Sequence, residues 1–268
     1  MVVNRHFGLM ILVFTLSLAA GCATNPITGK TELMLISEQQ EIEIGKSYAP
    51  EIEKQIGGRI QDEVLQNYIN SVGQKIARVS HNQSFKYSFT ALQDKSVNAF
   101  ALPAGYIFIT KGMLETLQTE AQLAGILAHE ITHVVARDVA NAMSNQIGIE
   151  LLLSAVTSEE TSKTALTVAQ LGTQIMSLRF SRQDEQEADL GGLDYMIAAG
   201  YNPYGLVECM DMLATQNEQR PIEFLSTHPA PENRSAYLKQ SIMTKQFSLP
   251  NTKIGKEEYR TAVLSRLN

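Results

Sequence analysis

The chain has 268 residues, and its 22 lysines and arginines against 28 aspartates and glutamates give a net charge of −6. Apolar residues make up 44% and charged residues 19%, so the chain can bury a core and is not intrinsically disordered. No basic run is present, so no nucleic acid is expected as a partner. Two cysteines are too few for a disulfide scaffold or a four-cysteine zinc site.

The first 21 residues have the pattern of a bacterial lipoprotein signal peptide. Arg5 supplies a positive charge, residues 7–20 form an apolar run that is short for a membrane span, and small residues precede Cys22. This pattern resembles a lipobox, in which the cysteine becomes the acylated N-terminus; an ordinary secretory signal is the alternative. Ala23 in place of aspartate favours the outer membrane. We therefore expect a periplasmic protein anchored to the membrane by lipid at Cys22.

The remaining chain is predicted to form one mainly helical α+β domain, residues 37–268, joined to the lipid by a tether, residues 22–36. No internal repeat is visible. Periodicity and turn signals predict these elements in chain order: helices over 37–56 and 62–80, extended segments over 85–92 and 97–110, and helices over 112–136, 140–156, 163–199 and 203–215.

The most informative motif is His129-Glu130-Ile131-Thr132-His133, within a stretch compatible with a helix. Residues four apart on a helix share a face, so both imidazoles can reach one metal ion. Imidazole nitrogen suits Zn²⁺, and a catalytic zinc site has three protein ligands and an open position. Glu130 can lie over that position as a general base. Without a metal, two histidines on this apolar helix would be buried with no evident partner.

A third ligand is needed, and the acidic segment 181–189 is its best source. Glu185 and Asp189 are four residues apart and share a helix face, whereas Glu187 points away from it. One carboxylate can bind the metal while the other accepts a hydrogen bond from a ligand histidine. A solvated acidic helix face is the alternative interpretation.

His228 lies in a turn stiffened by Pro229 and Pro231, and Arg234 begins the helix that follows. A rigid loop that presents His228 and Arg234 suits stabilisation of a transition state near zinc. His228 could instead occupy the fourth zinc position and keep the site latent. A surface loop histidine is the third reading.

These motifs together resemble a known family, the zinc metallopeptidases related to HtpX and the CAAX prenyl protease (metallopeptidase family forty-eight). The resemblance is carried in order by residues 98–105 (NAFALPAG), 129–133, 181–189 and 227–234. Within the family, the lipobox adds a similarity to the periplasmic BepA/LoiP-like lipoproteins. The resemblance implies a zincin-like domain with a small β-sheet and an active-site helix.

The family pattern also implies roles for single residues. It makes His129, His133 and Glu185 the ligands of one Zn²⁺ per chain, Glu130 the catalytic base, and Asp189 the partner of a ligand histidine. We expect His228 or Arg234, or a tyrosine, to stabilise the oxyanion. The resemblance further places the strand that begins after Asn98 beside the cleft, with Asn98, Ala99, Phe100 and Ala101 as substrate-binding residues.

The expected function is therefore hydrolysis of peptide bonds in unfolded or misassembled envelope proteins, by a zinc metalloendopeptidase of protein quality control. A latent protease that acts mainly as a chaperone or assembly factor for outer-membrane proteins is one alternative. A structural zinc domain without catalysis is another, which Glu130 and the apparent set of three ligands disfavour.

Overall fold

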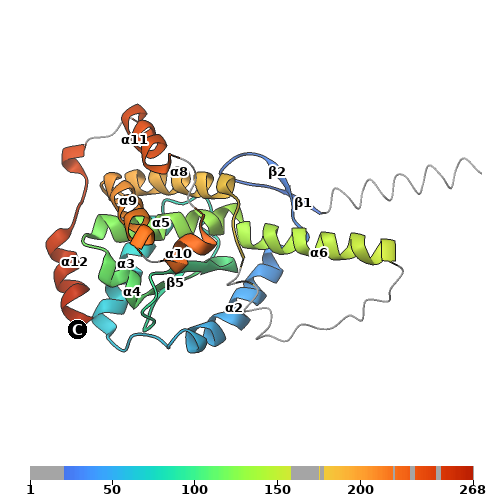
Figure 1. Cartoon of the computed structure of the whole chain (residues 1–268), viewed down its shortest axis with the longest axis horizontal. Helices are drawn as coiled ribbons and strands as arrows, with labels where there is room; N and C mark the ends of the chain where they lie inside the picture. Colours follow the sequence, from blue (N-terminus) through green and yellow to red (C-terminus); the bar gives the residue numbers. More distant parts are fainter. Residues whose placement is uncertain are drawn as a thin grey trace, which may run out of the picture.

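The computed structural model describes residues 21–157, 175, 178–219, 221–229, 233–245 and 249–267. These residues are mainly helical with two small β-sheets, which confirms the predicted α+β class (Figure 1). The predicted signal peptide lies, apart from Gly21, outside the described residues. None of the helices in the described ranges has the length and apolar character needed to span a bilayer.

The segment predicted to be a tether forms a hairpin that packs on the domain. Strand β1 (Cys22–Thr24) pairs antiparallel with β2 (Thr31–Leu33), and α2 (Glu38–Gln55) follows after a capping box made by Ser37. Between them, Met34 and Ile36 are buried in a cluster with Ala140. This part of the chain is therefore attached to the body through apolar contacts as well as through its covalent continuation.

The larger sheet has three strands in the order β3-β5-β4. Its strands are β3 (Ser88–Leu92), parallel to β5 (Tyr106–Thr110), and β4 (Ala99–Leu102), antiparallel to β5. The two predicted extended segments are thus confirmed, and β4 is an edge strand. The turn between β4 and β5 holds Ala104 at a φ of 63° and Gly105 at 93°, a backbone region that favours glycine.

A single helix was expected over residues 112–136, and this expectation is wrong. The chain forms α4 (Lys111–Thr116) and then α5 (Glu120–Ala136), because Leu117 is extended and the Thr119 side chain accepts a hydrogen bond from the Gln122 backbone. Such a cap begins a new helix. Before the sheet, α3 (Glu63–Ala77) confirms the predicted second helix and covers β3.

Helix α5 is the centre of the fold, and all 17 of its residues are buried. It packs most extensively on α8 (Arg182–Ala198) and α9 (Tyr204–Gln219), and Figure 1 shows α8 running alongside it. Glycines permit this approach: a Cβ at Gly192 would lie 3.0 Å from the His129 backbone nitrogen, and one at Gly205 2.6 Å from the Ala121 carbonyl carbon. Helix positions on α5 are therefore fixed closely by backbone contact.

The helix predicted over 163–199 begins much later than expected. Residues 178–181 are not helical, and α8 begins at Arg182 after a capping box formed by Ser181 and Asp184; residues 158–174, 176 and 177 lie outside the described residues. Four more helices complete the chain: α6 (Asp138–Thr157), α10 (Glu223–Thr227), α11 (Arg234–Thr244) and α12 (Lys256–Ala262). The predicted start of a helix at Arg234 is confirmed; α10 and α12 were not predicted.

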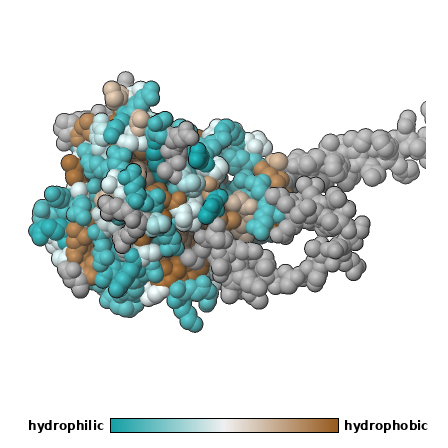
Figure 2. All heavy atoms as spheres, in the orientation of Figure 1, coloured by the Kyte–Doolittle hydropathy of each residue, from teal (hydrophilic) through white to brown (hydrophobic). Residues whose placement is uncertain are grey.

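The surface of the described residues is mixed in polarity. On the face seen in Figure 2, hydrophilic residues cover most of the surface and smaller hydrophobic areas interrupt them. A few large apolar side chains are exposed, including Met243 at 81% and Ile254 at 52%. Scattered apolar side chains of this kind are normal on a soluble domain face.

Candidate active site

The two histidines of α5 meet in the interior of the protein. His129 and His133 are one helical turn apart and almost fully buried, and their Nε2 atoms lie 3.1 Å from each other. Glu130 lies between them in sequence and is also buried. The helix therefore brings two nitrogen donors to one point, as the spacing predicted.

Glu185 of α8 and His228, which follows α10, complete this cluster. Glu185 Oε2 is 3.4 Å from His129 Nε2 and Glu185 Oε1 is 3.4 Å from His133 Nε2. His228 Nδ1 lies 3.4 Å from His129 Nε2 and 2.8 Å from Glu185 Oε1. A tetrahedral zinc site with bonds of about 2.0–2.1 Å has ligands about 3.3 Å apart, so four donors are spaced as the corners of such a site.

The chemistry of these donors fits a metal ion. One potential ligand atom from each of His129, His133, Glu185 and His228 lies within 4.8 Å of all the others, and all four residues are buried. Both carboxylate oxygens of Glu130, and Oε2 of Glu185, are buried with no hydrogen-bond partner. Buried carboxylates without partners are costly, and a cation would satisfy them. The cluster is thus able to hold a metal ion.

A second carboxylate on α8 supports His129 from behind. Asp189 Oδ1 lies 3.1 Å from His129 Nδ1, and Arg234 donates to both oxygens of Asp189, from Nε at 2.6 Å and from Nη2 at 2.5 Å. The Tyr237 hydroxyl donates to the same carboxylate. Burial would raise the pKa of Asp189, but the charge of Arg234 and the hydrogen bond with His129 hold it below its usual value. Asp189 is therefore ionised at neutral pH.

The structure gives His133 a carboxylate partner that the sequence analysis missed. Asp138, the first residue of α6, lies with its Oδ2 2.6 Å from His133 Nδ1, and the pair is buried. Burial raises the pKa of Asp138 to about 6, against the opposing effect of its hydrogen bond with His133. The only sequence signal is an aspartate five residues after the second histidine, where the helix ends.

Two aromatic rings that the sequence analysis also missed enclose the histidines. Phe180 stacks on His133, with ring centroids 4.2 Å apart and an interplanar angle of 18°. Phe224 stacks on His228 at 4.5 Å and 15°. Their apolar faces restrict ring rotation and help to exclude water from the cluster, which strengthens electrostatic interactions within it.

The predicted substrate-binding residues divide between two faces of the sheet. Asn98, Phe100 and Ala101 line a narrow pocket that His228 also lines, so this edge of the sheet does reach the cluster. Ala99 is fully buried in the main core and offers no side chain to a ligand there. The Asn98 Oδ1 atom is buried without a hydrogen-bond partner.

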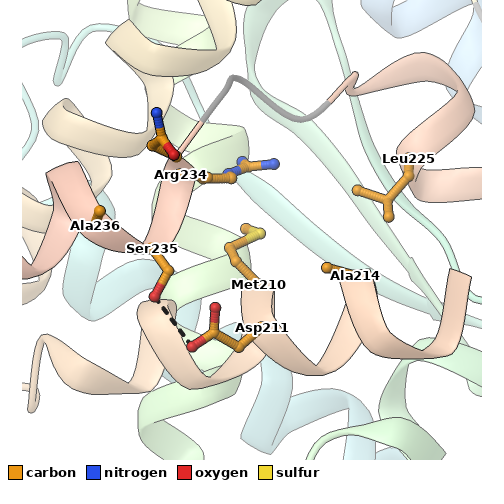
Figure 3. A pocket seen from close by; sticks show the side chains of 8 residues that line it. Met210, Asp211, Ala214, Leu225, Arg234, Ser235 and Ala236 are labelled. Carbon is orange, nitrogen blue, oxygen red and sulfur yellow. Dashed lines mark hydrogen bonds between the residues drawn. The ribbon is translucent and has the colours of Figure 1, made fainter. Parts of the chain in front are cut away.

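Two other predicted residues lie away from the four donors. The thiol of Cys22 is exposed and free, in the hairpin at the beginning of the described chain. Arg234 contacts Asp189 on its buried side, and it also lines a separate surface pocket of about 390 Å³ between α9 and α11 (Figure 3). There the Ser235 hydroxyl donates to Asp211 at 3.1 Å.

Comparisons with known proteins agree with this geometry. Residues 63–242 match the family model described as Peptidase family M48. The chain is 32% identical over 229 residues to the Beta-barrel assembly-enhancing protease of Escherichia coli (strain K12), covering 80% of this chain and 46% of that protein. It is 30% identical over 204 residues to the Mitochondrial metalloendopeptidase OMA1 of Schizosaccharomyces pombe, covering 72% and 59%. The chain spans about half the length of the curated relatives it matches.

Proposed function

The chain belongs to peptidase family M48, and we propose that it is a zinc-dependent metalloendopeptidase with His129, His133 and Glu185 as metal ligands. The observation that carries this proposal is the set of buried donors at near-tetrahedral spacing beside Glu130, whose carboxylate has no hydrogen-bond partner. Zinc bound there would act as a Lewis acid that polarises the scissile carbonyl and acidifies a water molecule.

The residues of this chain would divide the remaining work. Glu130 would accept the proton from the attacking water and later deliver it to the leaving amine. Asp189 would hold His129 in one orientation. Because the hydrogen bonds of Arg234 go to Asp189, we assign Arg234 the positioning of that carboxylate rather than direct stabilisation of the oxyanion.

His228 has two roles open to it, and the geometry favours one. Its Nδ1 atom lies among the donors, and its Nε2 lies 3.7 Å from Glu130 Oε1. In that position His228 would fill the fourth corner of the site and occupy the place that a water and a substrate carbonyl need. We propose that this arrangement is latent, and that His228 moves away when substrate is cleaved.

The proposed substrates are extended polypeptides, in particular unfolded or misassembled envelope proteins. The edge strand β4 has backbone groups available for pairing, and Asn98 and Ala101 line the pocket beside His228. Pairing with an edge strand reads the backbone of a substrate rather than its sequence. Similarity to a protease named for enhancing β-barrel assembly supports substrates from the outer membrane.

The proposed location is the periplasmic face of the outer membrane, with a lipid on Cys22. The lipobox-like sequence before Cys22 and its exposed thiol support this proposal. A diacylglycerol with a further acyl chain would give a stable anchor. Incorporation of labelled palmitate into the wild-type chain but not into Cys22→Ser would test it.

A second candidate function is favoured by the position of His228. If His228 stays among the donors in the cell, the chain would act mainly by binding unfolded outer-membrane proteins, as a chaperone or assembly factor. Proteolysis would then be a minor activity, used when assembly fails.

The experiment that decides between these functions is cleavage of casein by the chain beginning after Cys22, loaded with zinc. Wild type would be compared with Glu130→Gln at matched metal content. Cleavage by wild type alone supports the peptidase. If neither protein cleaves casein although both bind zinc stoichiometrically, His228→Ala separates latency from a binding role.

A further inference from the structure

We propose that Asp138 is a positioning residue that sets the orientation and the protonated nitrogen of His133. The proposal rests on the metal centre proposed above and adds a residue to it. Its basis is the 2.6 Å separation of Asp138 Oδ2 and His133 Nδ1 in a buried pair. In the described part of the chain, His133 is the only residue that donates a hydrogen bond to the Asp138 side chain.

The backbone between α5 and α6 places this carboxylate. Helix α5 ends at Ala136, and Arg137 adopts a left-handed conformation with a φ of 62°. The chain thereby changes direction within one residue, and Asp138 returns to the last turn of α5. The turn is held from outside, because Arg137 donates to the carboxylate of Glu41 and, at 2.8 Å, to the carbonyl of Ile36.

The chemistry of the pair determines which nitrogen of His133 can bind a metal. An ionised carboxylate only accepts hydrogen bonds, so Nδ1 of His133 must carry the proton. The lone pair of the neutral ring is then on Nε2, which lies 3.1 Å from His129 Nε2 and 3.4 Å from Glu185 Oε1. Asp138 therefore presents His133 to the centre of the cluster in the state that a metal ligand requires.

The two carboxylates behind the histidines are not equivalent. Asp189 shares its charge among His129, Arg234 and Tyr237. Asp138 lies closer to its imidazole, at 2.6 Å against 3.1 Å for Asp189 and His129. Since no arginine or lysine contact of Asp138 is present among the described residues, its charge acts on His133 alone. We infer that Asp138 raises the basicity of His133 more than Asp189 raises that of His129.

The test measures metal binding rather than peptidase activity. Zinc dissociation constants would be determined by competition with a chromophoric chelator for wild type, Asp138→Asn and Asp138→Ala, and visible absorption spectra would be recorded after loading with cobalt. Glu187→Gln is the matched control, since Glu187 also carries one negative charge near the start of α8 but pairs with Lys30 at 3.3 Å. Thermal unfolding of the metal-free proteins would be measured in parallel.

We expect zinc affinity to fall about 10–100-fold for Asp138→Ala, with a change in the cobalt spectrum. Asp138→Asn retains an acceptor and should fall between alanine and wild type, while Glu187→Gln should match wild type. A merely structural role would lower the thermal midpoint and leave the dissociation constant and spectrum unchanged, and that result overturns the proposal. Absence of zinc binding by wild type would instead refute the proposed metal centre. If Asp138→Ala does not fold, Asp138→Asn alone decides.

Discussion

The guanidinium of Arg234 and the imidazole of His129 bind the same carboxylate, that of Asp189. Arg234 Nε lies 2.6 Å from Asp189 Oδ2, and His129 Nδ1 lies 3.1 Å from Asp189 Oδ1. All three groups are buried. Through this carboxylate, α11 is joined to the helix that carries the candidate metal ligands, so the C-terminal part of the domain helps to fix the orientation of His129.

Removal of Arg234 should therefore destabilise the whole domain. Arg234→Ala leaves the Asp189 charge buried without its main partner, at a cost of about 3–5 kcal/mol in the free energy of unfolding. Urea denaturation of metal-free protein would measure this cost. The exposed Arg260, which pairs with Glu257, provides the control: Arg260→Ala should change stability by less than about 1 kcal/mol. Equal effects of the two substitutions would contradict the prediction.

Much of the site could be predicted because its signals are local. The spacing of His129 and His133 requires only a helix, and the pair Glu185 and Asp189 requires only that a second helix face the first. The structure places the carboxylate of Glu185 beside both histidines. What residue reasoning left open, the choice between Glu185 and Asp189, depends on the depth at which α8 crosses α5, a tertiary property set at Gly192.

Other features could not be predicted because they depend on tertiary contacts or on single caps. Asp138 reaches His133 only because Arg137 is left-handed, and nothing in the sequence near Arg137 signals that conformation. The break before α5 depends on one threonine cap, Thr119, in a segment whose apolar periodicity continues across it. The late start of α8 depends in the same way on the cap at Ser181.

Glu130→Gln should abolish peptide hydrolysis and leave zinc binding intact. The amide has nearly the same shape but cannot accept the proton of the attacking water, and a general base contributes about 10²–10⁴-fold. We expect kcat for casein fragments to fall by at least about 100-fold at unchanged zinc stoichiometry. Retention of near wild-type turnover, with zinc content verified by mass spectrometry, would show that Glu130 is not the base.

His228→Ala should raise peptidase activity. His228 Nδ1 lies 3.4 Å from His129 Nε2 and its ring is stacked on Phe224, so it occupies the fourth corner that substrate needs. We expect roughly a 10-fold gain in kcat/KM, equivalent to about 1.4 kcal/mol, together with weaker zinc binding. A loss of activity at full zinc occupancy would instead identify His228 as a group that assists the reaction.

Zinc should stabilise the folded protein. Only the folded chain brings the donors of α5, α8 and the α10 end within 4.8 Å, so zinc binds that state preferentially and raises stability by about 4 kcal/mol at 1,000 times its dissociation constant. Thermal unfolding with a chelator, and again after zinc is restored, would measure the shift. The double variant His129→Ala/His133→Ala should show no zinc-dependent shift; a shift that persists in it would place the zinc elsewhere.

Glu120 should make stability depend on pH. Burial would raise the pKa of Glu120, but hydrogen bonds from Lys253, Tyr68 and Tyr201 at 2.6–2.8 Å hold it below its ordinary value. A carboxyl whose folded pKa is depressed stabilises the fold above its unfolded pKa, about 4.3, and loses that contribution as pH falls through the folded pKa.

The comparison of wild type with Glu120→Gln tests this dependence. At pH 7 the variant should lose about 1–3 kcal/mol, and the difference between the two proteins should remain constant down to about pH 5 and shrink at lower pH. Urea denaturation at pH 7, 5, 4 and 3 would measure it. Glu115→Gln, at a half-exposed side chain paired with Lys111, should stay within about 0.5 kcal/mol of wild type at pH 7. A difference for Glu120→Gln that grows on acidification would mean that Glu120 is protonated in the folded protein and that its hydrogen bonds do not hold a charge.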